Sequence, residues 1–329
     1  MIKDKVNVLV TGSGGVTGKA VKRICHKYVN KNFIFIKSSD LDLRDFKKTL
    51  DFFKENQIEE VINLAAVSGG IGISLKHQAS MLRDNVLINL SIVEACVRCN
   101  VNKLVLCLTT GMYPENAKLP LTEDNIHNGE PSLTNYGSSF AKRLIEPVIR
   151  SYREEYDLNV VGLIPSGIYG PEDNFHPMHA PMLPAIINRA YEAKKNNSDL
   201  EIWGTGKPLR EYTFSEDIAE IFIWALDHFD SEKPINIGNP EELSIKNIVY
   251  LICKKIGIDK SKIFFNTNKP DGIFKKTSSN KNFQILNNFN YIPMEQGINK
   301  TIDWFLKVKD NNEVFLENSK IKEFNIYDR

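Results

Sequence analysis

Three glycines near the amino terminus have the spacing of a dinucleotide-binding turn. Gly12, Gly15 and Gly18 stand three residues apart, between an apolar run and a helical pattern. In a strand–turn–helix unit, this spacing lets a pyrophosphate approach the main chain and rest on the helix N-terminus, where free N–H groups favour an anion. A P-loop would need a glycine at position 13 and Ser or Thr at position 20, which hold serine and alanine. A tight glycine turn without a ligand is the other interpretation.

The residues that follow the second apolar run, 33–36, indicate which dinucleotide is bound. An NAD enzyme usually presents an acidic side chain there to the ribose 2′-hydroxyl, whereas this chain has Lys37 and Ser38. A cation and a hydroxyl suit a 2′-phosphate, so NADP is favoured over NAD; the alternative is that Lys37 is only a solvated strand end. Asp42 and Ala65 complete the predicted cofactor-binding residues of this region.

These residues need a scaffold that brings the ends of separate strands together. Apolar runs predict strands at 6–10, 33–36, 60–66, 103–108 and 159–165, and helical patterns are found at 46–56, 85–99 and 135–155. Such alternation predicts an α/β protein with a Rossmann-type doubly wound parallel sheet, whose ligands bind beyond the carboxyl ends of the strands. Gly12, Lys37 and Thr109 follow three of those ends, so we expect them to share one crevice.

The pattern changes after residue 170. Helices are predicted at 183–195, 215–229, 245–256 and near 294–308, with a turn-rich strand around residue 202. We expect an NADP-binding Rossmann domain over 1–170, to which later segments return, and a smaller C-terminal lobe that binds substrate, mainly over 171–309. The polar tail, 310–329, is expected to be loosely ordered.

Composition excludes several classes of function. The 329 residues are 42% hydrophobic and 25% charged, with a formal net charge of +1, so no electrostatic footprint for nucleic acid is present. No apolar run approaches a membrane span and no signal peptide is expected. The five cysteines are odd in number and scattered, which favours reduced thiols and a cytoplasmic protein. Cys96 and Cys99 have the spacing of a redox or zinc pair, but they lie in a helical pattern without a second pair, so no metal site is expected.

Further stretches carry a resemblance to a known family. They are Asn-Leu-Ala-Ala at 63–66, Met-Tyr-Pro-Glu-Asn at 112–116, Ile-His-Asn-Gly at 126–129, Ala-Lys-Arg at 141–143, Tyr-Gly-Pro-Glu-Asp-Asn-Phe at 169–175, Trp-Gly-Thr-Gly at 203–206 and Lys-Pro-Asp-Gly at 269–272. With them, residues 6–308 resemble the extended short-chain dehydrogenase/reductases, in particular the GDP-L-fucose synthase (GDP-4-keto-6-deoxymannose epimerase-reductase) branch. The resemblance implies an NADP-dependent enzyme that acts on a GDP-linked sugar. It also implies a homodimer, formed through the helix after residue 85 and the helix that bears residue 142.

In that family, a serine after the fourth strand hydrogen-bonds the keto oxygen, a tyrosine gives the proton, and a lysine four residues later holds the ribose. By this resemblance Thr109 takes the serine position and Lys142 the lysine position, but Ser138 stands where the tyrosine is expected. An aliphatic hydroxyl is a far weaker acid than a phenol, whose pKa is near 10, so we expect Ser138 to relay a proton through water. Tyr136 is the alternative acid, although two residues turn a helix by about 200° and face it away.

The residues that move protons during epimerisation at C3 and C5 are also replaced. The family's cysteine position holds Gly111 and its histidine position holds Pro181, while a family asparagine falls on Gly167. His179 is an alternative proton carrier in the same loop, and together with His176 it has the spacing of a metal pair that lacks a third ligand. The loss of both proton carriers predicts that 3,5-epimerisation is absent.

The substrate-binding residues that the resemblance implies are retained. The guanine and pyrophosphate contacts fall on Arg189, Trp203, Arg210, Lys269 and Asp271, and Arg and Lys suit a diphosphate. The combination predicts C4 keto-reduction of a GDP-4-keto-deoxy sugar without epimerisation. Two alternatives stay open: a catalytically silent homologue or partner subunit that binds NADP and a nucleotide sugar, and a dehydratase or epimerase whose mechanism needs no tyrosine.

Overall fold

The chain folds into two compact units, each assembled from three segments. The computed structural model describes residues 5–69, 71–176, 180–269, 271, 275, 277–279, 284, 286 and 289–310. The first unit consists of Met1–Ser166, Ser215–Gly238 and Ser278–Phe289, and the second of Gly167–Phe214, Asn239–Thr277 and Asn290–Arg329. The chain therefore passes between the units several times. Of the tail predicted over 310–329, residue 310 ends a helix and 311–329 lie outside the described residues.

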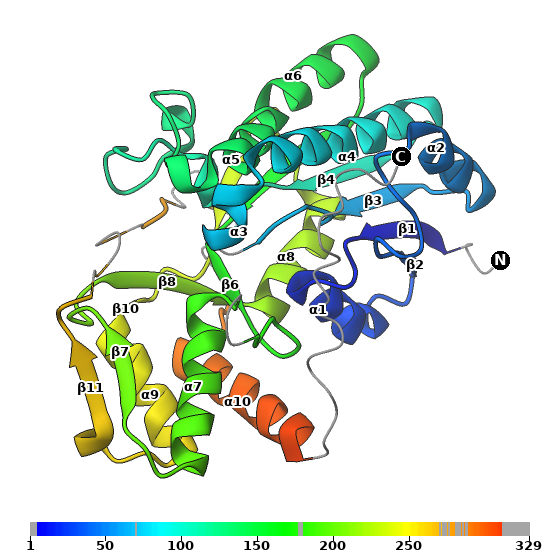
Figure 1. The fold of residues 1–329 in the computed structure, drawn as a ribbon. Helices are drawn as coiled ribbons and strands as arrows, with labels where there is room; N and C mark the ends of the chain where they lie inside the picture. The colour runs from blue at the N-terminus through cyan, green and yellow to red at the C-terminus, as the bar shows by residue number, and fades with distance from the viewer. Residues whose placement is uncertain are drawn as a thin grey trace. The chain divides into compact units, whose positions relative to one another are not determined.

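A parallel sheet of six strands forms the centre of the first unit (Figure 1). Its order is β2-β1-β3-β4-β5-β9, and each neighbouring pair is parallel. The strands are β1 (Val6–Thr11), β2 (Lys31–Phe35), β3 (Glu60–Asn63), β4 (Lys103–Cys107), β5 (Val160–Pro165) and β9 (Ile235–Ile237). The order reverses beside β1, as in a doubly wound sheet. The predicted fold class is confirmed.

Helices cover both faces of this sheet, α1 and α8 on one and α2, α4, α5 and α6 on the other (Figure 1). Their bounds are α1 (Val16–Ile24), α2 (Phe46–Glu55), α3 (Ile71–Lys76), α4 (Gln78–Arg98), α5 (Tyr136–Arg143), α6 (Ile145–Tyr156) and α8 (Ser215–His228). Because both faces are covered, the strands are near-continuous runs of buried apolar residues rather than alternating ones. This is why the apolar runs alone revealed the strands from β1 to β5.

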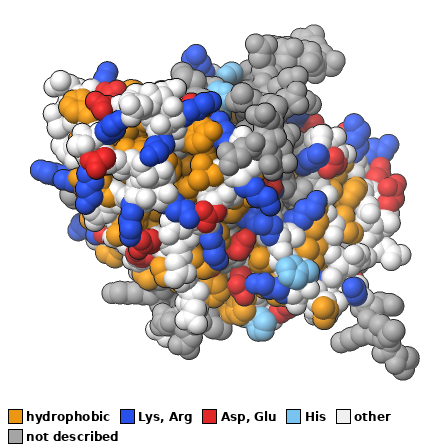
Figure 2. Space-filling model, turned by 90° about the horizontal axis from the view of Figure 1, so that it is seen from below, with side chains coloured by type: hydrophobic (Ala, Val, Ile, Leu, Met, Phe, Trp, Pro, Cys, Tyr) orange, Lys and Arg blue, Asp and Glu red, His pale blue; other side chains and the backbone are white. Residues whose placement is uncertain are grey.

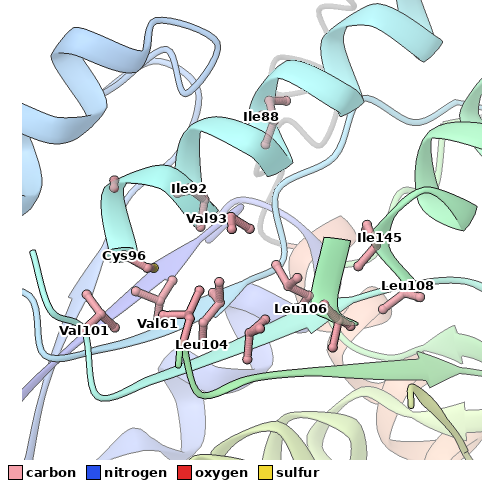
Figure 3. Packing of buried hydrophobic residues seen from close by; sticks show 14 of the residues in the cluster. Val61, Ile88, Ile92, Val93, Cys96, Val101, Leu104, Leu106, Leu108 and Ile145 are labelled. Atoms are coloured by element: carbon pink, nitrogen blue, oxygen red, sulfur yellow. The ribbon is translucent and has the colours of Figure 1, made fainter. Parts of the chain in front are cut away.

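The hydrophobic core lies between α4 and the sheet (Figure 3). Ile88, Ile92 and Cys96 recur at helical spacing and point from α4 toward the strands. Leu104 and Leu106 meet them from β4 and are fully buried. Cys96 and Cys99 are free thiols, and Cys96 is a core residue.

Two helices occupy the region for which one long helix was predicted. The single helix over 135–155 is wrong: α5 ends at Arg143 and α6 begins at Ile145. Pro147 explains the interruption, because it has no N–H to donate to the carbonyl of Arg143 and its ring crowds that carbonyl. The break makes α5 a short helix of its own, and that helix carries Ser138 and Lys142.

Several other boundaries differ from the sequence expectation. Helix α4 begins at Gln78 rather than at residue 85, and α3 occupies part of an expected loop. Strand β9 escaped prediction because only the three residues Ile235–Ile237 form it. Its place in the sheet depends on pairing with β5, which lies far away in the sequence. Strand β3 ends at Asn63, so residues 64–66 belong to the loop that follows.

The described residues of the second unit form two small sheets and three α-helices. Its strands are β6 (Gly167–Tyr169), β7 (Leu200–Trp203), β8 (Leu209–Phe214), β10 (Glu242–Ser244) and β11 (Ile263–Asn266), and its helices are α7 (Met182–Lys195), α9 (Ile245–Ile256) and α10 (Met294–Asp310). One sheet has the order β10-β8-β6 and the other pairs β11 with β7. Tyr169, Phe214 and Phe305 lie in the core that these elements share.

The surface agrees with the balanced composition. Basic and acidic side chains are interspersed over the face drawn in Figure 2. Within the described part of the chain, no helix is long and apolar enough to cross a membrane.

Candidate functional site

The glycine turn joins β1 to α1 in a conformation that two of its glycines make possible. Gly12 has φ +62°, and a Cβ there would lie 2.7 Å from the carbonyl carbon of Leu64. A Cβ on Gly18 would lie 2.5 Å from Ser13 Cα, so this glycine allows α1 to pack against the turn. Gly15 is the N-cap of α1 without a side-chain cap, which leaves N–H groups of the first helical turn available to an anion.

The end of β2 lies beside this turn. The Ser13 N–H donates to Ile36 O at 3.0 Å, and a Cβ built on Gly14 would be 3.8 Å from Lys37 Cβ. Lys37 and Ser38 are both exposed. The turn therefore has a solvated cation and a hydroxyl at its side, the groups that suit a 2′-phosphate. The residues present fit that cofactor.

A chain of buried amides fixes the end of β3, and sequence reasoning missed it. Thr11 Oγ1 donates to Asn63 Oδ1 at 2.6 Å and accepts from the Ala65 N–H at 3.2 Å. Asn63 Nδ2 donates in turn to Asn89 Oδ1 at 3.0 Å, and Asn89 Nδ2 donates to Asn85 O at 2.7 Å. These bonds hold Ala65 next to Gly12. In the sequence, only the polar residues Thr11, Asn63 and Asn89 at otherwise apolar strand and helix positions could have indicated this chain.

Asp42 lies after β2 in an ion pair. Its carboxylate accepts from Arg44 Nη2 at 2.7 Å, and the hydrogen bond from Arg44 lowers the pKa of Asp42. Arg44 Nη1 also reaches Asp84 Oδ2 on α4 at 3.2 Å. Asp42 is thus held as a carboxylate beside the loop after β2, with 46% of its side chain exposed.

Lys142 and Thr109 both lie at the carboxyl end of β4. Lys142 Nζ donates to Cys107 O, the last residue of that strand, at 2.6 Å. Lys142 is 7% exposed, and burial lowers the pKa of its ammonium group. Thr109 caps the 3₁₀ turn Thr110–Met112, where its Oγ1 accepts from the Gly111 N–H at 3.2 Å. The structure therefore brings these two predicted catalytic residues to one strand end.

Arg143, which sequence reasoning assigned no role, ties down the turn after Thr109. It is 6% exposed and its guanidinium donates to Met112 O at 2.6 and 3.0 Å and to Gly129 O at 2.7 Å. Its side chain also covers the ring of Phe140 at 5.0 Å. One buried cation thus holds two loops against α5.

Ser138 and Tyr136 lie in the first turns of α5. The Ser138 hydroxyl donates to Asn135 O at 3.0 Å, so its oxygen remains able to accept a hydrogen bond. Tyr136 is 36% exposed and its ring packs on Phe140 at a centroid distance of 4.7 Å. Its i, i+4 partner is thus Phe140, whereas that of Ser138 is Lys142.

The three replaced family positions have different surroundings. A Cβ on Gly111 would meet Thr109 Oγ1 at 3.5 Å, an ordinary contact, so a side chain fits at this position. A Cβ on Gly167 would lie 2.8 Å from the ring of Tyr212, so an asparagine does not fit without movement. Pro181 is the N-cap of α7. His179 lies outside the described residues.

Trp203, Lys269 and Asp271 meet in the second unit at the ends of β7 and β11. Lys269 Nζ lies 5.3 Å from the centroid of the Trp203 ring, and Trp203 is 58% exposed. The Asp271 carboxylate accepts from the Thr205 N–H at 2.6 Å and from Thr205 Oγ1 at 2.8 Å. The side-chain hydrogen bond from Thr205 lowers the pKa of Asp271. This arrangement offers a flat aromatic surface, a cation and an ionised carboxylate.

The two predicted arginines lie near the same strands. Arg189 on α7 donates to Glu201 O of β7 at 3.4 Å and has an exposed side chain. Arg210 lies on β8, after the turn that carries Asp271's partners, and donates to Leu209 O at 2.7 Å. The second unit thus holds the predicted substrate set, whereas the predicted cofactor and catalytic sets lie in the first.

Comparison with known proteins agrees with this geometry. Residues 8–238 match the NAD dependent epimerase/dehydratase family. The chain is 37% identical over 314 residues to a GDP-L-fucose synthase from Dictyostelium discoideum, covering 94% of this chain and 97% of that protein.

Two solved structures have the same fold over almost the whole chain. A GDP-L-fucose synthetase from Naegleria fowleri bound to NADP is 33% identical, with a TM-score of 0.88 and coverage of 94% and 95%. A GDP-6-OMe-4-keto-L-xylo-heptose reductase from C. jejuni is 25% identical, with a TM-score of 0.83 and coverage of 92% and 98%. The chain belongs to the NAD-dependent epimerase/dehydratase family, within its GDP-L-fucose synthase-like group of enzymes.

Proposed function

We propose that this enzyme uses NADPH to reduce the C4 ketone of a GDP-linked 4-keto-deoxy sugar and does not epimerise C3 or C5. The glycine turn, the exposed Lys37 beside it and the similarity to an NADP-bound structure support the cofactor. The similarity to a GDP-4-keto sugar reductase supports the reaction. Trp203, Lys269 and their neighbours support a GDP-linked substrate, since an exposed indole stacks a base and cations bind a diphosphate.

The chemistry requires a hydride and a proton. NADPH supplies the hydride to C4. In our proposal, the Thr109 hydroxyl hydrogen-bonds the carbonyl oxygen, on which negative charge develops, and Lys142 holds the nicotinamide ribose with its buried ammonium group. A water that donates one hydrogen bond to the Ser138 oxygen gives its other proton to the ketone oxygen, and the hydroxide left behind takes a proton from solvent; the Ser138 oxygen can accept because its own hydrogen goes to Asn135. The products are the C4 alcohol and NADP⁺.

Gly111 is the observation that separates reduction from epimerisation. Epimerisation next to a ketone needs a base within reach of the carbon-bound hydrogen and an acid on the other face. Gly111 offers no side chain beside Thr109, at the position where the family resemblance implies a cysteine. Pro181, at the other proton-carrying position, has no titratable group. The reductase activity is therefore expected to leave C3 and C5 unchanged.

The test is an assay of the purified protein with NADPH and GDP-4-keto-6-deoxymannose. We expect nicotinamide absorbance to fall and the product to be a C4 alcohol whose C3 and C5 protons do not exchange in deuterated water. Deuterium at either carbon would contradict the absence of epimerisation. No NADPH oxidation with any GDP-4-keto-deoxy sugar would contradict the reductase activity.

Ser138 favours a second candidate function, a silent homologue that binds NADP and a nucleotide sugar. The variant Ser138→Tyr separates the two, because a phenol restores the family's acid next to Lys142. Weak activity in the wild type that rises about 10²-fold or more in the variant supports a reductase with a slow proton step. Tight binding of NADP and GDP with no turnover in either protein supports the silent homologue.

We also propose that the enzyme forms a homodimer through α4, α5 and α6. Leu82 and Leu87 on α4 are 41% and 40% exposed, and Leu144 and Tyr156 beside α6 are 42% and 49% exposed. Large apolar side chains on adjacent helices are typical of an interface. We expect Leu87→Glu to convert a dimer into a monomer in sedimentation velocity, with Val29→Glu, at an exposed position distant in sequence, as the control. A monomeric wild type would contradict the proposal.

A further inference from the structure

Two adjacent serines on α5 direct their hydroxyls differently. Ser138 donates to Asn135 O at 3.0 Å. Ser139 is 2% exposed, and its hydroxyl makes no hydrogen bond to any other residue that the structure describes. The residue is enclosed but its hydroxyl oxygen is not among the fully buried unsatisfied atoms, so it is available to a ligand group. The surroundings of Ser139 Oγ therefore indicate what it is placed to contact.

Ser139 Oγ borders the same small space as Thr109 Oγ1. An ideal Cβ on Gly111 would lie 3.6 Å from Ser139 Oγ, 3.5 Å from Thr109 Oγ1 and 3.6 Å from Thr109 Cγ2. Apart from Gly111 and its two chain neighbours, no heavy atom would lie closer than 3.5 Å to this Cβ. Two hydroxyl oxygens thus face one position, at the end of β4 where we place the reacting ketone. These two hydroxyls therefore flank the side of Gly111 that a side chain would otherwise fill, and a ligand group that packs against Gly111 on that side lies beside both of them.

We propose that Thr109, Gly111 and Ser139 form a subsite for the hydroxyl on the carbon next to the ketone of the substrate. This inference rests on the proposed function, because Thr109 must bind the C4 carbonyl oxygen. C4 of a 4-keto-6-deoxyhexose has two neighbours: C5 carries the ring oxygen and a methyl group, and C3 carries a hydroxyl. Ser139 therefore hydrogen-bonds the C3 hydroxyl, and the missing side chain of Gly111 leaves room for it.

The subsite makes the enzyme selective for 3-hydroxy over 3-deoxy sugars. A sugar without the C3 hydroxyl leaves Ser139 unpaired, and a site built to hydrogen-bond a substrate group rejects an analogue that lacks it. Ser139 is thus a specificity-determining residue, whereas Ser138 acts on the proton that goes to the C4 carbonyl oxygen. Substitution of Ser139 should therefore change the preference between the two sugars, whereas substitution of Ser138 should leave that preference unchanged.

The experiment compares GDP-4-keto-6-deoxymannose with its 3-deoxy analogue in NADPH oxidation. We expect Ser139→Ala to lower kcat/KM about threefold to tenfold for the 3-hydroxy sugar and to leave the 3-deoxy sugar unchanged, as the loss of one hydrogen bond predicts. The new methyl of Gly111→Ala makes only ordinary contacts. This variant should also lower the ratio of kcat/KM for the 3-hydroxy sugar to kcat/KM for the 3-deoxy sugar. The matched control is Ser80→Ala on α4, a serine that is 5% exposed and donates to His77 O at 3.1 Å.

Two outcomes would overturn the inference. An equal loss on both sugars in Ser139→Ala would mean that Ser139 acts on the carbonyl or on the fold, and a ratio that changes only in Ser138→Ala would assign the subsite to the other serine. Calorimetric titration of both sugars in the presence of NADP⁺ gives the same comparison without turnover. If wild type binds the two sugars with a difference that Ser139→Ala abolishes, the subsite stands even where reductase activity is absent. Equal affinities in wild type would contradict it.

Discussion

Replacing Gly12 by alanine should damage both the fold and the cofactor site. At φ +62° a non-glycine residue costs roughly 1–2 kcal/mol. The new Cβ would also lie 2.7 Å from Leu64 C and 2.8 Å from Ala65 N, whereas non-bonded carbon atoms pack at about 3.5–4.0 Å. The ends of β1 and β3 must therefore separate by nearly an ångström. Overpacking of this kind typically costs about 1–3 kcal/mol, so we expect a total loss of about 2–5 kcal/mol.

The assay is thermal unfolding of the purified variant with and without NADP⁺. Gly12→Ala should unfold several degrees below wild type, and added NADP⁺ should no longer raise its Tm. The matched control lies in the same turn: a Cβ on Gly14 meets only Lys37 Cβ, at 3.8 Å, and this glycine has no left-handed φ. The free energy of unfolding of Gly14→Ala should therefore lie within about 1 kcal/mol of the wild-type value. If Gly12→Ala matched Gly14→Ala in Tm and still gained stability from NADP⁺, the steric argument would be refuted.

Three further predictions concern the loops around this site. Lys142→Met should lower reductase kcat by about 10²–10⁴-fold and weaken NADPH binding in a fluorescence titration; unchanged affinity would exclude the ribose contact. Arg143→Met leaves the Met112 carbonyl unpaired and should reduce the free energy of unfolding in urea by about 2–4 kcal/mol, so wild-type stability would contradict its anchoring role. The pKa of Asp42 is lowered in the folded protein, so the Arg44 pair stabilises above the unfolded pKa of about 3.8 and this contribution is lost as pH falls through the folded value. Arg44→Met should raise the pKa of Asp42 in an NMR titration, with a stability loss of less than about 1 kcal/mol because both side chains are nearly half exposed; an unchanged pKa would remove Arg44 as the cause.

The sequence by itself determined the sheet and the cofactor turn. The strands from β1 to β5 contain runs of apolar residues, and the contact of Gly18 with Ser13 lies within the turn itself, whereas the contact of Gly12 with Leu64 forms only when β1 pairs with β3. The order of strands and helices then left few topologies, because parallel strands need crossovers of one hand. The interruption between α5 and α6 was missed, although its cause, Pro147, is a local feature of the sequence.

The tertiary structure decided what depends on residues far apart in the chain. Strand β9 is too short to be recognised without its pairing to β5. The side-chain amides of Asn63 and Asn89 form their hydrogen bond only when β3 and α4 pack together. The same is true of the two serines of α5. Their sequence position suggested Ser138 as the reacting hydroxyl, but only the folded chain shows that Ser139 faces Gly111 and Thr109. Side-chain direction on a short helix is set by what packs against it, and that information is not local.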